Sequence, residues 1–144
     1  MKFELDERLN NDCFTLAETN FSLWLLLNNR NFPWFIIVPK TDVEELYLLP
    51  KDMQVKLQLQ STLMSEFVTT HFPCDKLNVA SIGNIVKQMH VHIIGRTETD
   101  LCWPGVVWGT EHKEEYGKSE VLDIQSKLTT FCQRKTEYFI VFPV

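Results

Sequence analysis

The sequence predicts an α+β fold, with a mainly antiparallel sheet and two helices. Strand-like segments come first, a long helical segment follows, and further strands and a second helix complete the chain. The 144 residues, of which 44% are hydrophobic and 23% charged, suit one folded domain with a core of its own. No internal repeat, low-complexity tract or linker interrupts them, so we expect a single domain over residues 1–144.

Three strand-like segments lie near the start of the chain. Residues 13–18 (CFTLAE) and 21–28 (FSLWLLLN) are the first two, and the second is apolar on both faces, as a central buried strand would be. An Asn-rich turn, NNRNFP, leads to residues 34–40 (WFIIVPK), which are rich in β-branched and aromatic side chains. Together these segments predict a hairpin.

A helix is predicted from about residue 51 to residue 72. Its apolar residues recur at roughly helical intervals: Met53, Leu57, Met64, Phe67 and Phe72. Pro50 lies near the first turn and Pro73 follows the end, both favourable places for proline. Residues 55–59 also alternate like a strand, but the length of the whole segment favours a helix.

Two more strands and a second helix are predicted in the rest of the chain. Residues 76–83 (KLNVASIG) form the first of these strands, Gly83-Asn84 a turn, and residues 88–96 (QMHVHIIGR) the next strand. The helix carries apolar residues at helical spacing: Val121, Ile124, Leu128 and Phe131. Residues 137–144 (EYFIVFPV) predict either a strand or an extended tail.

Charge and composition narrow the choice of partner and compartment. The net charge of -5 and the pI of about 5.3 give no global attraction to nucleic acid or to an anionic membrane. No run of about 18 apolar residues and no signal peptide is visible, so we expect a cytoplasmic protein with no membrane contact. None of the four cysteines forms a CxxC pair, and reduced thiols are expected.

The segment KQMHVHIIGR places polar side chains at alternate positions of a predicted strand. Gln88, His90 and His92 share one face, while Met89, Val91 and Ile93 share the other and can pack on the core. Three interpretations are open: a solvated polar face, two ligands of a metal site that lacks a third ligand nearby, or a catalytic site. A neutral imidazole is a nucleophile or general base near pH 7 without extreme tuning.

QMHVHII resembles the histidine triad motif, in which three histidines alternate with hydrophobic residues; Gln88 stands where the first histidine is expected. LLLNNRNFPWFIIVPK is similar to the paired strands of that family, and KLNVASIGNIVKQMHVHIIGR to its strand, phosphate-side loop and motif strand. WPGVVWG (residues 103–109) fits a bacterial-type subgroup with Gln at the first position. The resemblance covers residues 16–109 and implies a HIT-like fold with a five-stranded-type sheet, usually paired into a homodimer.

The resemblance also implies a role for each matching residue. His90, at the middle position, would attack the α-phosphorus of a nucleotide, and His92, at the last, would contact phosphate oxygens or the leaving group. Asn28, at the end of the first paired strand, would hydrogen-bond the ribose hydroxyls. Asn84 matches a loop residue that touches phosphate, and Asn78 is a looser match to the same loop.

Gln88 is the departure from the motif. The first histidine of the family mostly supports the site from behind, and a carboxamide offers both a donor and acceptors for that purpose. It cannot gain a positive charge, which bears on rate and pH dependence more than on the type of reaction. We therefore keep Gln88 in the predicted catalytic face with His90 and His92.

The expected function is that of a nucleotide hydrolase or transferase that forms a nucleotidyl-histidine on His90. Its substrates would be dinucleoside polyphosphates, nucleoside phosphoramidates or related nucleotidyl compounds. The sequence indicates no cofactor and no metal, although a divalent ion beside a polyphosphate is left open. A nucleotide-binding or regulatory protein with little turnover is the alternative, and a zinc-binding structural domain is the third.

Other residues near the motif have structural explanations as well as functional ones. Trp103 and Trp108 would form either a nucleobase wall or part of the packing. Three cations flank the predicted site and are expected to be solvated: Arg30, Lys87 and Arg96. His71 and His112 are isolated in the sequence and are expected to be structural or surface residues.

Overall fold

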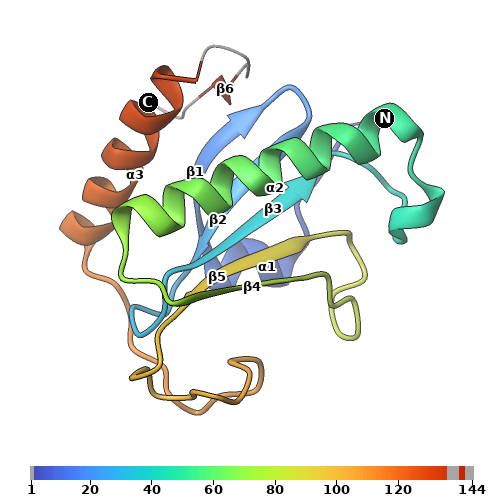
Figure 1. Cartoon of the computed structure of the whole chain (residues 1–144). Coiled ribbons are helices and arrows are strands. Elements are labelled where there is room, and N and C mark those ends of the chain that lie inside the picture. The colour runs from blue at the N-terminus through green and yellow to red at the C-terminus, as the bar shows by residue number, and fades with distance from the viewer. Residues whose placement is uncertain (1, 136–139, 142–144) are drawn as a thin grey trace.

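The structure is a computed structural model that describes residues 2–135 and 140–141 (Figure 1). Within these residues six strands form one sheet in the order β4-β5-β3-β2-β1-β6, with every neighbouring pair antiparallel. The strands are β1 (Cys13–Thr19), β2 (Ser22–Leu27), β3 (Trp34–Pro39), β4 (Lys76–Ala80), β5 (Val91–Arg96) and β6 (Ile140–Val141). The chain forms β1, β2 and β3 as a meander, because short turns join consecutive strands.

Two long helices cover one face of the sheet. They are α2 (Lys51–His71), which crosses the strands, and α3 (Lys118–Gln133), which lies beside it near β1 (Figure 1). The short helix α1 (Glu7–Asp12) lies on the opposite face, and a 3-10 turn, η1 (Leu46–Leu48), precedes α2. The predicted α+β fold is confirmed; α1 and η1 are additions to the elements that the sequence predicts.

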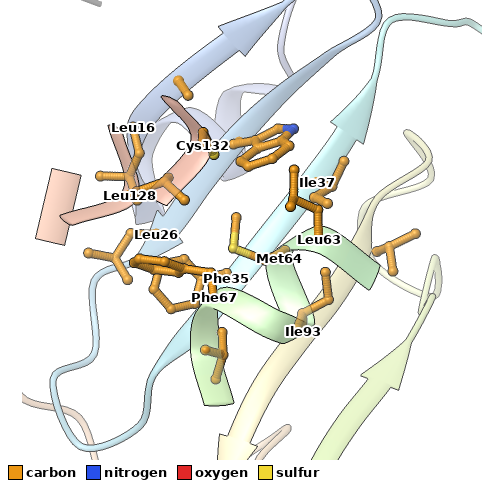
Figure 2. Packing of buried hydrophobic residues seen from close by; sticks show 14 of the residues in the cluster. Leu16, Leu26, Phe35, Ile37, Leu63, Met64, Phe67, Ile93, Leu128 and Cys132 are labelled. Atoms are coloured by element: carbon orange, nitrogen blue, oxygen red, sulfur yellow. The ribbon is translucent and has the colours of Figure 1, made fainter. Parts of the chain in front are cut away.

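Alternation along β3 divides the apolar residues into two cores. Phe35 and Ile37 face the helices and pack with Met64 and Phe67 of α2, as Figure 2 shows. Trp34, at an alternate position, faces the other side, where Leu9 of α1 and Val107 of a long loop cover the sheet. The loop runs over residues 97–117, between β5 and α3. The helix-side core is the larger, so it supplies most of the apolar burial that stabilises the fold.

Two of the predicted strands are shorter than expected. β4 ends at Ala80, and β5 begins at Val91, so residues 88–90 precede the strand instead of forming its first part. Residues 88–90 have no partner strand among the described residues. The ladder between β5 and β3 ends at the pair Val91–Ile37, and the ladder between β5 and β4 ends at the pair His92–Ala80. Of the C-terminal segment that predicts a strand or tail, residues 140–141 pair with β1, and the rest lies outside the described residues.

The four cysteines are all free, as predicted, and only Cys132 is fully buried. In the part of the chain that the structure describes, no helix combines the length and apolar character needed to cross a membrane.

Candidate active site

The ring of His90 is held by the backbone carbonyl of Gln88, two residues earlier in the chain. Its Nδ1 lies 2.7 Å from the carbonyl oxygen of Gln88, and the side chain is only 4% exposed. A carbonyl can only accept, so Nδ1 carries a proton, and in the neutral form of the ring the lone pair is on Nε2. This arrangement meets the requirement for an imidazole that attacks through Nε2.

His92 lies next to His90 on the same side of the sheet, with the two ring centroids 4.9 Å apart. The indole N–H of Trp34 donates to Nδ1 of His92 at 2.8 Å. Trp34 and Trp108 both approach the His92 ring edge-on, at centroid distances of 5.8 and 5.3 Å. Burial and the neighbouring His90 lower the pKa of His92 to about 3, so its ring is neutral at pH 7.

The pairing of β3 with β5 places these groups together. Ile36 lies opposite His92 and Trp34 opposite Ile94, so all four side chains share the face that the long helices leave open. Met89, Val91 and Ile93 pack in the helix-side core instead, as the alternation of the sequence predicts.

The side chain of Gln88 binds the N-terminal segment and not the histidines. Its Oε1 accepts from the backbone N–H of Asp6 at 2.8 Å, and its Nε2 donates to the carbonyl of Glu4 at 2.9 Å. A carboxamide presents its donor and its acceptor at the same end, whereas a neutral imidazole carries them on opposite sides of the ring. Glutamine therefore suits this two-point contact with an extended backbone, and a histidine does not.

A cavity of about 450 Å³ adjoins the aromatic side of the site. Its walls include Asn28, Trp34, Trp108 and Lys113, and α1 closes one side through Asn11. Trp34 thus belongs both to this cavity and to the hydrogen bond with His92. Neither histidine lines the cavity directly.

His90 lines a second, more polar cavity of about 310 Å³. Its neighbours there are Glu44, Glu45, Lys87 and Gly83. His90 thus opens on the second cavity, whereas Trp34 and Trp108 line the first.

The three predicted asparagines have different surroundings. Asn28 lines the larger cavity, and its Oδ1 accepts from the backbone N–H of Tyr116 at 2.9 Å. Asn84 is exposed in the loop between β4 and β5. Asn78 lies on β4, where its Oδ1 accepts from Arg96 at 2.9 Å, so the structure ties it to that cation and not to the histidines.

Arg96 is not a solvated surface charge, contrary to the expectation from the sequence. It is 2% exposed, pairs with both carboxylate oxygens of Asp100 at 2.7 and 3.0 Å, and donates to the carbonyl of Gly105 at 2.8 Å. Its guanidinium also lies 5.7 Å from the centre of the Trp103 ring. Trp103 therefore packs on Arg96, and Trp108 is the tryptophan of this loop that reaches the site.

The remaining candidates lie away from the histidine pair. Arg30 is exposed and pairs with Glu114 and Glu120. His71 is exposed, and its ring packs against those of Phe67 and Phe131 at centroid distances of 4.8 and 6.0 Å. His112 is exposed.

Sequence patterns gave no sign of two important contributors, Trp34 and the N-terminal segment. Trp34 is one of several apolar residues in a buried strand, and only the register with β5 reveals its contact with His92. Within the described residues, no three side chains of His, Cys, Asp or Glu gather closely enough to hold a metal ion.

The fold agrees with comparisons to known proteins. The family model of the HIT domain matches residues 8–99, and the chain belongs to this family. Among curated proteins, none matches this chain.

Solved structures support the same conclusion. A histidine triad protein of Marinobacter aquaeolei is 36% identical, with a TM-score of 0.87 over 93% of this chain and 98% of that one. One from Sinorhizobium meliloti is 33% identical, with a TM-score of 0.86 over 90% and 96%. A diadenosine triphosphate hydrolase of Plasmodium falciparum shares the fold, at 14% identity and a TM-score of 0.50 over 94% and 84%.

Removing the carboxamide of Gln88 should release the N-terminal segment. We expect Gln88→Leu to lower the free energy of unfolding by about 1 kcal/mol, because two partly exposed backbone groups lose their partner. The amide of Asp6 should then exchange its hydrogen faster. Gln88→Glu is the matched control, since it keeps the acceptor for that amide and loses only the donor to Glu4. Equal exchange at Asp6 in wild type and Gln88→Leu would contradict this role.

Proposed function

We propose that the protein cleaves a nucleoside phosphate linkage in two steps through a nucleotidyl-histidine on His90. The observation that carries this proposal is the 2.7 Å bond from Nδ1 of His90 to the Gln88 carbonyl, which directs the lone pair of the neutral ring to Nε2, beside the neutral ring of His92. Membership of the HIT family supports a nucleotide as the substrate.

In the first step, Nε2 of His90 attacks the α-phosphorus. An N–P bond forms, the bond from phosphorus to the leaving group breaks, and the leaving group departs with the electron pair and takes up a proton from solvent. A neutral nitrogen suits this attack, because phosphate oxygens repel an anionic nucleophile. The carbonyl of Gln88 stabilises the ring as it gains positive charge, through the proton held on Nδ1.

In the second step, water attacks the phosphorus and the N–P bond breaks. The nucleoside monophosphate leaves, the water proton passes to solvent, and His90 returns to its neutral form. Splitting one displacement into two easier ones is the benefit of a covalent intermediate. An alcohol or a second phosphate in place of water would make the same chemistry a transfer.

The nucleoside is proposed to occupy the larger cavity. Asn28 lines it at the end of β2, where its amide group is available to the ribose hydroxyls, and Trp34 and Trp108 offer flat apolar surface to a base. Lys113 adds a positive charge to a wall that also carries Glu115. The phosphate would extend past the tryptophans toward His90.

A nucleotide-binding protein with little turnover is the second candidate. It is favoured by the low exposure of the catalytic pair, 4% for His90 and 7% for His92, since a substrate must reach Nε2 to react. Turnover of a fluorogenic adenosine phosphoramidate and of diadenosine polyphosphates separates the two functions. Tight nucleotide binding without turnover on this panel would favour the second.

The homodimer expected from the family is also a proposal, with the edge strand β4 as its interface. β4 ends the sheet, so one side of its backbone has no strand neighbour in the described residues. Exposed apolar side chains lie beside it on the helix face of the sheet: Leu46, Val55 and Val79. A second copy that pairs along β4 around a two-fold axis would cover both features.

Replacing His90 by Ala should abolish turnover, by roughly 10³-fold or more, because no other group replaces its nitrogen. The fold and nucleotide binding should persist. His112→Ala is the control, an exposed histidine outside both cavities that should retain activity. Mass spectrometry of the wild type, quenched without acid, should find the nucleotidyl adduct on His90. Substantial turnover by His90→Ala would disprove the covalent role.

Replacing Asn28 by Ala should weaken the binding of adenosine monophosphate by about 5- to 30-fold, a loss of about 1–2 kcal/mol. Asn28→Asp keeps an acceptor for the Tyr116 amide and for the ribose, so it should bind almost as well as wild type. Calorimetry and thermal melting of both variants check this. Unchanged affinity with a lower Tm in Asn28→Ala would mean that Asn28 only holds the loop at Tyr116.

Light scattering of the native protein should give about twice the chain mass of 16.9 kDa. Val79→Lys places a charge on the exposed face of β4 and should yield the monomer. Leu122→Lys, at an equally exposed position on α3, should leave the dimer intact. A monomeric wild type, or a dimer that survives Val79→Lys, would rule out this interface.

A further inference from the structure

Trp34 restricts the protonation of His92 by the chemistry of its own side chain. An indole nitrogen is a donor only, so its bond to Nδ1 of His92, at 2.8 Å, requires a lone pair on that atom. A neutral imidazole has one proton, which must then lie on Nε2. His90 has the reverse arrangement, with its proton on Nδ1 and a lone pair on Nε2.

The indole is held firmly enough to enforce this choice. Trp34 is 5% exposed, and its backbone lies in the β3–β5 ladder opposite Ile94. The rings of Phe32 and Trp108 pack edge-on against it, at centroid distances of 6.4 and 5.9 Å. A turn of the His92 ring would leave a buried N–H of Trp34 without its acceptor, which is costly in a protein interior.

We infer that Trp34 is a positioning residue that holds His92 in the Nε2–H tautomer, so that the pair offers one nucleophilic nitrogen and one hydrogen-bond donor to the same phosphate. The benefit of this tautomer to catalysis rests on the proposed function, whereas the tautomer itself follows from the hydrogen bond to Trp34. The donor is in place before the substrate arrives, and it needs no positive charge on His92. Burial beside His90 keeps the pKa of His92 at about 3, which agrees with a donor that is neutral.

Imidazole nitrogen chemical shifts test the inference without any substrate. In protein labelled with ¹⁵N-histidine, long-range proton–nitrogen spectra distinguish a protonated from an unprotonated ring nitrogen. We expect His92 to show an unprotonated Nδ1 and His90 an unprotonated Nε2. Assignment comes from the single variants of each histidine. A protonated Nδ1 on His92 in the native protein would overturn the inference whatever the activity is.

Trp34→Phe keeps an aromatic ring and removes only the donor. His92 should then populate both tautomers, and kcat should fall at least about tenfold because the phosphate loses its fixed donor. Trp108→Phe is the matched control for the spectrum. Trp108 also packs edge-on against His92, but its indole N–H has no hydrogen-bond acceptor in the described part of the chain. Its loss should leave the His92 tautomer unchanged.

The outcomes separate the two proposals. An unchanged His92 tautomer in Trp34→Phe would reject the positioning role. A native protein with the expected tautomers but no turnover on any nucleotidyl substrate would instead reject the proposed function and leave the role of Trp34 standing. If Trp34→Phe does not fold, the spectrum of the native protein still decides the tautomer.

Discussion

The antiparallel pairing of β3 with β5 joins two parts of the sheet that α2 separates in the sequence. Its register sets Ile36 opposite His92, and through this pair it brings the indole of Trp34 within reach of the imidazole. A slip of one residue would turn His92 toward the helices and Met89 and Ile93 away from their core. The apolar contacts of the helix-side core therefore hold the polar site in register, although they lie on the other face of the sheet.

Much of the fold follows from local patterns. The first three strands, α2 and α3 each carry a periodicity that predicts them, and proline marks both ends of α2. The helix α1 is six residues long with one buried side chain, Leu9, which is too little for a pattern. The start of β5 was predicted three residues early, because alternation continues through residues 88–90 where no neighbouring strand is present to extend the ladder.

The site was predictable in its residues but not in its contacts. His90 and His92 stand out because imidazoles are rare in a segment whose other side chains pack in the core. The bond of His92 to Trp34 spans 58 residues, and those of Gln88 to the N-terminal segment span 82 and 84. No local periodicity encodes such distances. Gln88 was expected to join the histidines through its side chain, yet its backbone carbonyl is the part that reaches His90.

The cluster of the buried Arg96 with the half-buried Asp100 and Asn78 has a consequence for how this family member can change. Removing Asp100 or Asn78 would leave the buried guanidinium of Arg96 without one of its partners, so these positions are expected to vary together or not at all. A lysine cannot reproduce the forked contact of Arg96 with Asp100. Leu101 and Val106 lie in the same loop but are 56% and 64% exposed, and they are free to diversify. The exposed residues of the loop that leads to Trp108 can therefore change while the contact of Arg96 with Asp100 is kept.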